Sequence, residues 1–373
     1  MKTFVFWQNI ISIHQMPFLE ELSTLYEVYL FVEKAIDPER QRQGWKIPNS
    51  ERVGIKIFSR REVPDLLNSH REAFHIFSGI QSYANVDYAF RSAIRLGYNC
   101  SLIAEPQNWI GIGGAFRFLK TRIFAFRYSR KISFFLAIGS RGKWWYLKCG
   151  FPEGRVFEWG YTVQQPTSVE FNKNIKMVEK NRLPKLLYVG RITRSKGVFL
   201  LIEVLQKLHQ SFDSVTFIGE GPDLEDLKES ISGSIIRDKV IFKSNCSNEE
   251  VWREYTNFDY LVLPSISKDG WGAVISESLT MGTPVICSNF CGASSLIKET
   301  RGFVFNVDGS DLPLEVFRNA LTNQQFFSQK NKIEIREWAN KRIDKRSFTK
   351  YFDEIFSSEK DSLTKNVLAP WQV

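Results

Sequence analysis

The sequence predicts an α/β protein made of two domains, each a doubly wound parallel sheet. The chain has 373 residues, which is too long for one ordinary hydrophobic core and suits two domains of typical size. In its second half, short apolar runs alternate with longer stretches whose apolar residues recur at helical spacing. Strands that alternate in this way with helices form parallel sheets with crossover connections.

Composition indicates a globular chain. Hydrophobic residues make up 43% of the sequence and charged residues 24%. The five cysteines are an odd number without Cys-x-x-Cys spacing, which favours buried thiols in a reducing cytosol over disulfides or a zinc site. The apolar run after Met1 is too short for a signal peptide, and no uncharged stretch reaches the roughly 18 residues of a membrane span. We therefore expect a cytoplasmic protein.

The first half, residues 1–165, is compatible with one α/β domain. It opens with a strand, and residues 16–32 then show the apolar spacing of a helix. Strand-like runs follow near residues 73–77 and 101–104. The next segment, 166–182, is polar and contains Pro166, so we expect a linker there.

The second domain is expected over residues 183–329, where strand and helix patterns alternate clearly. The last part, 330–373, begins with a charged segment whose apolar residues have helical spacing as far as residue 356. Within the second domain, the pattern predicts strands at 183–189, 215–218, 240–242, 260–263 and 285–287, and helices at 198–208, 224–231, 249–255 and 274–281.

A basic turn connects the first strand of this domain to the following helix. Arg191 and Lys196 lie in this turn, and Gly197 opens the helix. The turn directs unpaired backbone N–H groups and the positive end of the helix dipole to one point, so a guanidinium and an ammonium there make a place for a diphosphate. Taken singly, either residue is more simply a solvated turn residue.

An acidic motif follows the strand at 260–263. Asp269 and Glu277 are separated by seven residues, and Gly270 and Gly272 lie between them. The two glycines allow the backbone to approach a ligand closely, and a carboxylate near the start of the next helix can accept hydrogen bonds from ribose hydroxyls. A glutamate near a helix start is also explained by the helix dipole alone.

In this order, these motifs resemble retaining glycosyltransferases of family 4, the group 1 glycosyl transferases with the GT-B fold. The family's Gly-Arg and Lys-Gly pairs, its Gly-x-Gly-Pro turn, its Pro-Ser strand end and its Gly-x-Pro-Val strand start occur at 190–197, 219–222, 264–265 and 282–285. The family's Glu, seven residues, Glu element is present with Asp269 in place of the first Glu. The resemblance covers about residues 183–310.

The resemblance implies transfer of a sugar from a nucleotide-diphosphate sugar with retention at the anomeric carbon, without a metal or other cofactor. The sequence contains no Asp-x-Asp, the pair that holds a diphosphate through a divalent cation in metal-dependent glycosyltransferases. Arg191 and Lys196 would offset the charge that grows on the leaving diphosphate, Glu277 would hold the ribose and Asp269 would position the sugar. Further donor contacts are expected at Gly190, Gly219, Gly221, Gly270, Gly272, Ala273 and Val274.

The GT-B resemblance also implies that the two domains face each other across a cleft and that the segment 330–373 crosses back to the first domain. Family members often carry a first-domain His near the donor sugar. His14, after the first strand, and Glu105, at the end of the strand at 101–104, are the candidates for an acceptor-side role. Two other functions stay open: a nucleotide-sugar 2-epimerase of the same fold, or a catalytically degenerate binding subunit associated with a membrane.

A basic and aromatic segment stands out in the first domain. Residues 106–152 contain nine Lys and Arg residues and no Asp or Glu, and the net charge of the chain is +9. At helical spacing, several of these cations share one side of a helix, which favours an anionic membrane surface over a partly buried basic helix. No nucleic-acid motif accompanies the charge. The cations expected at the membrane are Arg117, Lys120, Arg127, Arg130 and Lys131.

These patterns together predict an enzyme that works at the inner face of the cytoplasmic membrane without spanning it. Relatives with basic surfaces commonly build bacterial surface polysaccharides, such as lipopolysaccharide or capsule, on a lipid carrier. The expected partners are therefore a nucleotide-sugar donor, a lipid-linked or oligosaccharide acceptor and anionic lipid, with no nucleic acid.

Overall fold

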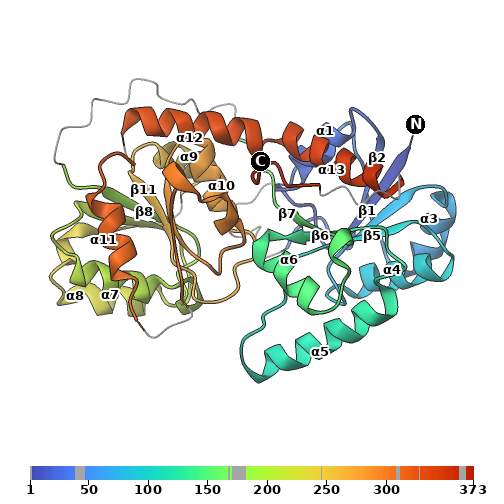
Figure 1. The fold of residues 1–373 in the computed structure, drawn as a ribbon, viewed down its shortest axis with the longest axis horizontal. Coiled ribbons are helices and arrows are strands. Elements are labelled where there is room, and N and C mark those ends of the chain that lie inside the picture. Colours follow the sequence, from blue (N-terminus) through green and yellow to red (C-terminus); the bar gives the residue numbers. More distant parts are fainter. Residues whose placement is uncertain are drawn as a thin grey trace. The chain divides into compact units, whose positions relative to one another are not determined.

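The computed structural model describes residues 2–37, 47–166, 169, 182–244, 246–307, 311–326, 328–360 and 367–373. The chain divides into two compact units, Met1–Gln164 with Ile343–Val373, and Gln165–Arg342 (Figure 1). We call them the N-terminal and the C-terminal unit. Each contains one parallel sheet, of seven strands in the N-terminal unit and six in the C-terminal unit. The α/β fold class predicted from the sequence is confirmed.

The sheet of the N-terminal unit has the strand order β3-β2-β1-β4-β5-β6-β7. Figure 1 shows α1 and α13 on one face of this sheet and α3, α4 and α5 on the other. The strands are β1 (Thr3–Gln8), β2 (Glu27–Val32), β3 (Gly54–Ile57), β4 (Phe74–Ser78), β5 (Cys100–Ala104), β6 (Phe135–Ile138) and β7 (Val156–Trp159). The helices are α1 (Met16–Leu22), α3 (Val63–Ser69), α4 (Ala84–Arg95), α5 (Gly111–Tyr128), α6 (Gly139–Lys148) and α13 (Lys345–Lys360).

Alternation along β1 builds a core on each face of the sheet. Phe4 and Phe6 both contact the ring of Phe352 on α13, with ring centroids 5.2 and 6.3 Å apart. Val5 and Trp7 belong to the cluster on the opposite face. Because successive side chains of a strand point to opposite faces, a strand that is apolar throughout must be covered on both sides.

The predicted helix over residues 16–32 is wrong in its second half. The helix α1 ends at Leu22, and residues Glu27–Val32 form β2 instead. This strand pairs with β1 in parallel register along its whole length, from Thr3 opposite Glu27 to Gln8 opposite Val32. The helical spacing extends over only a few residues here, and the segment is rich in Val, Tyr and Phe, which favour strands. Pairing with the buried central strand β1 therefore decides its structure.

The helical pattern at 330–356 belongs to two helices. The first, α12 (Gln329–Arg342), lies in the C-terminal unit, and α13 lies in the N-terminal unit and packs against α1. Between them, the Asp344 carboxylate accepts a hydrogen bond from the backbone N–H of Ser347 at 2.9 Å. A side chain that satisfies a free N–H in this way starts a new helix, so the pattern is interrupted there.

The last described residues are fixed to the N-terminal unit through a buried carboxylate. The Trp371 indole and the Gln372 amide donate to the two oxygens of Glu158, at 3.2 and 3.0 Å. The Tyr351 hydroxyl of α13 donates to the Glu158 carbonyl at 3.0 Å. Glu158 lies on the edge strand β7, so these bonds fasten the end of the chain to the sheet.

The sheet of the C-terminal unit has the order β10-β9-β8-β11-β12-β13. Figure 1 shows α7, α8 and α11 on one face and α9, α10 and α12 on the other. The strands are β8 (Lys185–Val189), β9 (Ser214–Ile218), β10 (Val240–Lys243), β11 (Tyr260–Leu263), β12 (Val285–Ser288) and β13 (Gly302–Phe305). The remaining helices are α7 (Val198–Lys207), α8 (Leu224–Ser232), α9 (Asn248–Tyr255), α10 (Ala273–Thr280) and α11 (Leu314–Thr322).

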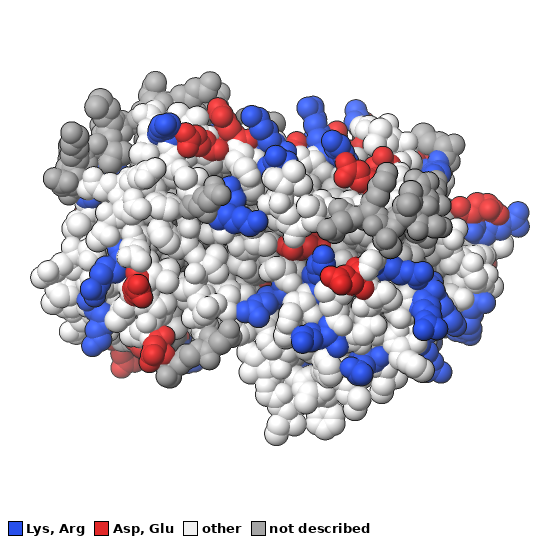
Figure 2. Space-filling view, in the orientation of Figure 1, with Lys and Arg blue, Asp and Glu red and all other residues white. Residues whose placement is uncertain are grey.

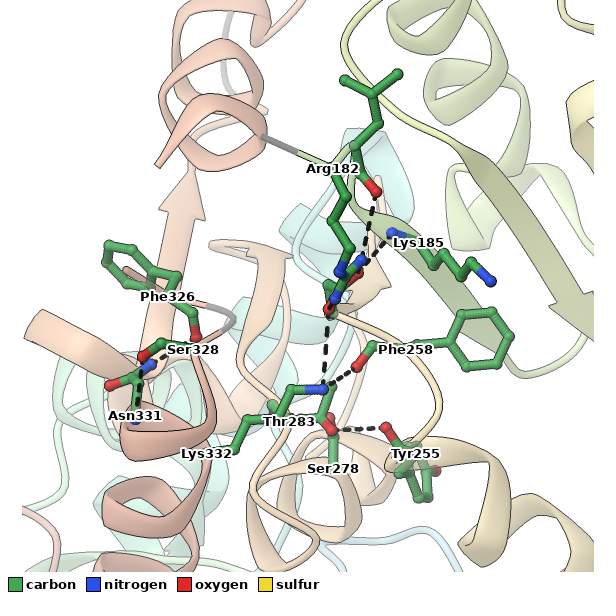
Figure 3. Close-up of polar contacts among 12 residues, drawn as sticks. Arg182, Lys185, Tyr255, Phe258, Ser278, Thr283, Phe326, Ser328, Asn331 and Lys332 are labelled. Atoms are coloured by element: carbon green, nitrogen blue, oxygen red, sulfur yellow. Dashed lines mark hydrogen bonds and ion pairs between the residues drawn. The ribbon is translucent and has the colours of Figure 1, made fainter. Parts of the chain in front are cut away.

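Most of the linker expected at 166–182 lies outside the described residues, but its end is anchored. The buried carboxylate of Asp259, the residue before β11, is contacted by Arg182, Lys185 and Lys332, which Figure 3 labels. Arg182 donates to both Asp259 oxygens, at 2.6 and 2.5 Å, and the N–H of Lys185 donates to one of them at 2.8 Å. The Lys332 ammonium of α12 lies 3.9 Å from the same carboxylate and donates to the Phe258 carbonyl at 2.6 Å.

Candidate active site

The candidate donor residues lie where the strand order of the C-terminal sheet reverses. The strands β8 and β11 are neighbours in the sheet but not in sequence, and the chain leaves them in opposite directions along the sheet. Because all these strands are parallel, the turns after β8, β9 and β11 lie at the same end of the sheet, where the carboxyl ends of the strands meet. Ligands of doubly wound sheets bind at such a reversal, in the crevice at the carboxyl ends of the strands.

The turns after β8 and β9 touch through their backbones. A Cβ at Gly219 would lie 2.1 Å from the Gly190 carbonyl oxygen, and one at Gly221 would lie 2.1 Å from the Ile192 carbonyl oxygen. The Ile192 N–H also donates to the Glu220 carbonyl at 2.9 Å. Both glycines are therefore explained by packing between two loops, whether or not they also approach a ligand.

A short 3-10 turn, Arg194–Lys196, leads into α7 through Gly197. Gly197 has a φ of 72°, and a Cβ there would lie 1.8 Å from the Pro264 carbonyl oxygen. The Ile266 N–H donates to the Ser195 carbonyl at 3.0 Å. These contacts hold the basic turn against the loop that follows β11, so the geometry of one fixes the other.

Lys196 and Asp269 form an ion pair at this junction. The Lys196 ammonium lies 2.6 Å from the Asp269 carboxylate, and the Ser265 hydroxyl donates to the same oxygen at 2.9 Å. The Asp269 side chain is 10% exposed and that of Lys196 is 28% exposed. The pair is sheltered enough for its electrostatic attraction to be stronger than that of a typical surface pair, and it orients the ammonium beside the strand-order reversal.

Glu277 is buried in the second turn of α10, not exposed at the helix start. Its carboxylate accepts a hydrogen bond from the Tyr255 hydroxyl at 2.7 Å, and the Thr283 hydroxyl donates to the Tyr255 carbonyl at 2.6 Å (Figure 3 shows the second bond). Burial raises the pKa of Glu277 to about 7, although the bond from Tyr255 acts to lower it. A carboxyl group with this pKa exchanges its proton near neutral pH.

The backbone between Asp269 and Glu277 is held in place from inside the unit. Gly272 has a φ of 82° and precedes the first residue of α10. Trp271 is buried, and its indole donates to the Ser276 hydroxyl at 3.0 Å. The half-buried Ala273 and Val274 begin the helix, so their N–H groups belong to its open first turn.

Of the four residues predicted to be catalytic, the structure pairs Lys196 directly with Asp269. Arg191 is an exposed residue of the turn after β8, and its carbonyl accepts a hydrogen bond from the buried Tyr188 hydroxyl at 2.6 Å. Glu277 lies on α10, which follows the Asp269 loop. Their roles toward a donor stay predictions, as do those of Gly190, Gly219, Gly221, Gly270, Gly272, Ala273 and Val274.

In the N-terminal unit, the structure brings the two acceptor-side candidates to one tyrosine. The His14 ring stacks on Tyr161, with ring centroids 6.2 Å apart, and the Tyr161 hydroxyl donates to the Glu105 carboxylate at 2.9 Å. His14 follows β1, Glu105 follows β5 and Tyr161 follows β7, so all three lie beyond the carboxyl ends of parallel strands. The two residues were alternatives in the sequence, whereas the structure joins them in one group.

The basic segment forms α5 and α6 around β6. Lys120, Arg127, Arg130 and Lys131 are exposed. Arg117 is half-buried and donates to the Asn108 carbonyl at 2.7 Å, so part of its hydrogen-bonding capacity is used within the protein. No helix of the described part of the chain is long and apolar enough to cross a membrane.

Three residues to which the sequence analysis gave no role in the site complete these groups. Tyr255 is the partner of Glu277, Tyr161 connects His14 to Glu105, and Ser265 holds Asp269. Ser265 belongs to the Pro-Ser strand end, so the sequence contained a signal for it. The two tyrosines lie on elements distant in sequence from their partners, and only the fold pairs them.

Comparison with known proteins finds glycosyltransferases that are similar to the C-terminal unit. Residues 170–335 match the family described as glycosyl transferases group 1. Over 127 residues, the chain is 32% identical to the sulfoquinovosyl transferase SQD2 of Arabidopsis thaliana, covering 33% of this chain and 24% of that protein. Over 132 residues, it is 35% identical to the putative teichuronic acid biosynthesis glycosyltransferase TuaC of Bacillus subtilis, covering 35% of this chain and 31% of that protein.

The whole chain also resembles solved structures. One is the crystal structure of Anabaena Alr3699/HepE in complex with UDP-glucose, with a TM-score of 0.67 at 13% identity over 96% of this chain and all of that one. At such low identity the likeness shows the fold, which is GT-B. Through residues 170–335, the chain is similar to the group 1 glycosyl transferases. It spans only about a quarter to a third of the length of the two relatives named above.

Proposed function

We propose that this protein transfers a sugar from a nucleotide-diphosphate sugar to a saccharide acceptor with retention of the anomeric configuration. The observation that carries the proposal is the junction of the basic turn with the Asp269 loop, where Lys196 is held at the strand-order reversal. A fixed cation at the carboxyl ends of the strands of a doubly wound sheet suits binding of a diphosphate. HepE, which shares the fold, was crystallised with UDP-glucose, in agreement with such a donor.

In the proposed reaction, the bond between the anomeric carbon and the diphosphate oxygen breaks, and negative charge grows on the leaving diphosphate. Lys196 and Arg191 stabilise that charge, which is the electrostatic contribution that often dominates catalysis. Asp269 keeps the Lys196 ammonium oriented before the donor arrives, so little reorganisation is needed during the reaction. The two cations take the part that a divalent metal plays elsewhere, and we propose that no metal is required.

Glu277 is proposed to bind the donor through ribose hydroxyls in its charged form. The carboxylate is protonated in part near neutral pH in the free protein, because burial favours the uncharged form. Two hydroxyl donors would repay the cost of charging it, so donor binding and loss of the Glu277 proton would be coupled. Tyr255 keeps one carboxylate oxygen in a fixed direction.

The proposed acceptor is a lipid-linked saccharide, and the setting is bacterial surface polysaccharide synthesis at the inner face of the cytoplasmic membrane. TuaC is named for teichuronic acid biosynthesis, which supports a polysaccharide product. The acidic and aromatic group of His14, Glu105 and Tyr161 offers hydrogen-bonding partners for acceptor hydroxyls at the end of the N-terminal sheet.

The test is to incubate the purified protein with a panel of nucleotide sugars and to measure nucleotide release with and without lipid-linked acceptor. Acceptor-dependent release, strongly reduced in Lys196→Ala and also reduced in Asp269→Asn, is the expected result. Conversion of one nucleotide sugar into another without release would show a 2-epimerase instead. Donor binding without release or conversion, together with an inert Asp269→Asn variant, would show a degenerate binding subunit.

A further inference from the structure

The outer face of α5 carries an apolar stripe that packs against no part of its own unit's core. Its side chains are largely exposed, reaching 92% for Phe126. They are spaced alternately four and three residues apart, which aligns them along one side of the helix. We call the following residues the α5 stripe: Ile112, Phe116, Leu119, Ile123 and Phe126.

The opposite face of α5 already supplies the contacts that hold the helix to its unit. Gly114, Thr121, Phe124 and Ala125 are buried. The Phe124 ring stacks on Phe90 of α4, with ring centroids 5.5 Å apart. The helix is therefore apolar on both faces, and only the inner one contributes to the hydrophobic core.

The other exposed apolar residues named for the N-terminal unit do not form a comparable row. Leu25, Ile57 and Leu96 are also more than half exposed, but they lie on different elements. Single exposed apolar side chains are ordinary on protein surfaces, whereas a continuous row of large ones marks an interaction surface.

Cations border the stripe on both sides. At 100° per residue, Lys120 and Arg127 fall on one side of it and Arg122 on the other, and all three are exposed. The sequence has no Asp or Glu from residue 106 to residue 152. In Figure 2, the surface at the α5 end of this unit is white, with blue Lys and Arg atoms beside it.

The charge selects between the surfaces that could cover the stripe. Two copies of the chain that met stripe to stripe would bring Lys120, Arg122 and Arg127 against the same cations of the other copy, and like charges in contact repel. An anionic lipid surface complements the same pattern, because apolar side chains enter the acyl boundary while cations contact the headgroups. Trp144, 40% exposed, contacts Trp109 just before α5, and tryptophan is enriched at this depth of a bilayer.

We propose that α5 lies flat in the interface of an anionic membrane, with the α5 stripe inserted among the lipid chains. An 18-residue helix presents a contact roughly 27 Å long. Of the cations expected from the sequence, Lys120 and Arg127 border the contact on one side, and Arg122, which was not among them, borders it on the other. The apolar stripe, which the sequence pattern did not single out, is the centre of the contact. Membrane binding itself does not depend on the proposed function. Only its purpose, to bring the N-terminal unit to a lipid-linked acceptor, rests on that function.

The experiment is sedimentation of the full chain with vesicles, in the absence of nucleotide sugar. Wild type should pellet with phosphatidylglycerol-containing vesicles and much less with pure phosphatidylcholine. The double variant Phe116→Ser, Phe126→Ser should bind at least about tenfold more weakly, because two large apolar side chains no longer leave water. The triple variant Lys120→Gln, Arg122→Gln, Arg127→Gln should lose the preference for anionic lipid and its weakening by salt.

Leu96→Ser is the matched control, because it removes an exposed apolar side chain of the same unit outside the stripe, and it should bind like wild type. The stripe is exposed, so the Ser variants should unfold at the wild-type temperature, which thermal unfolding checks. Wild-type binding by the double variant would overturn the proposal. So would a wild-type dimer that ignores vesicles and becomes monomeric in the double variant, since the stripe would then be a protein interface. Vesicle binding without sugar transfer would overturn the proposed function alone.

Discussion

Lys196 and Arg191 are two cations of one turn, but the structure gives them different surroundings. Lys196 is half-buried and paired with Asp269, whereas Arg191 is exposed on the turn. A sheltered cation stabilises a growing charge more strongly than an exposed one, because water screens the exposed one more.

We predict that Lys196→Ala and Arg191→Ala both lower kcat/KM, by about 2 to 4 kcal/mol in transition-state stabilisation, with the larger loss for Lys196. Steady-state kinetics on nucleotide release measures it. Lys207→Ala, at the exposed end of α7, is the control and should keep wild-type activity. Unchanged kinetics in both variants would remove the proposed diphosphate contacts.

The proposed role of Glu277 predicts that donor binding depends on pH. Its pKa in the folded protein is about 7, well above the usual value for Glu, because the side chain is buried. Since the charged form is the one proposed to accept from ribose, donor affinity should rise by up to about tenfold between about pH 6 and pH 8. In Glu277→Gln the donor KM should be higher and this dependence absent. Isothermal titration with the nucleotide diphosphate across that range tests it, and an unaltered pH profile in the Gln variant would exclude the role.

The raised pKa of Glu277 also makes the free energy of unfolding depend on pH. A carboxyl pKa raised on folding contributes stability below the unfolded pKa of 4.5, and this contribution is lost as the pH rises through about 7. At pH 8 wild type should therefore be less stable than Glu277→Gln, by up to about 3 kcal/mol. Tyr255→Phe should shift the loss to higher pH, because the Tyr255 bond lowers the Glu277 pKa. Urea unfolding at several pH values distinguishes these outcomes.

At the scale of elements, the geometry of the candidate donor site depends on the contact between the turn before α7 and the loop after β11. We predict that Gly197→Ala destabilises the C-terminal unit by at least about 3 kcal/mol, because its φ is 72° and the new Cβ would meet the Pro264 carbonyl. Gly233→Ala is the control: it follows α8 with a φ of −102° and open space around it, and should be neutral or slightly stabilising. Equal urea midpoints for the two variants would contradict this account.

On the scale of the whole chain, the C-terminal unit is closed by residues from its two ends. Arg182, near its start, and Lys332, on α12 near its end, share the Asp259 carboxylate. Burial lowers the pKa of Lys332 to about 8, which means that Asp259 offsets only part of the cost of burying the ammonium.

Asp259→Asn should destabilise the C-terminal unit by about 3 to 5 kcal/mol, because Arg182 and the buried Lys332 would both lose their ion pair with this carboxylate. Asp238→Asn, an exposed carboxylate of the same unit, is the control and should change the unfolding free energy by less than about 0.5 kcal/mol. Chemical denaturation followed by tryptophan fluorescence gives both values. An Asp259→Asn variant that is as stable as wild type would show that the two ends of the C-terminal unit are held together by apolar packing alone.

The sequence determined most of the alternation of the C-terminal unit, since its central strands are short apolar runs that are largely buried on both faces and the helices between them have their own period. It also determined the order of the donor motifs, because these are short segments at strand ends whose chemistry is local. In the N-terminal unit it failed at β2, where pairing with β1 overrode a helical spacing.

Only the tertiary structure decided which side chains meet. Tyr255 and Glu277 lie 22 residues apart, Tyr161 and Glu105 lie 56 apart, and Lys196 and Asp269 lie 73 apart. Such contacts depend on strand order, which local periodicity does not encode. The α5 stripe shows the same limit: the sequence shows which of its residues are apolar, but whether they face the core or the solvent depends on which side of the helix the sheet covers, and burial of one face left the other exposed.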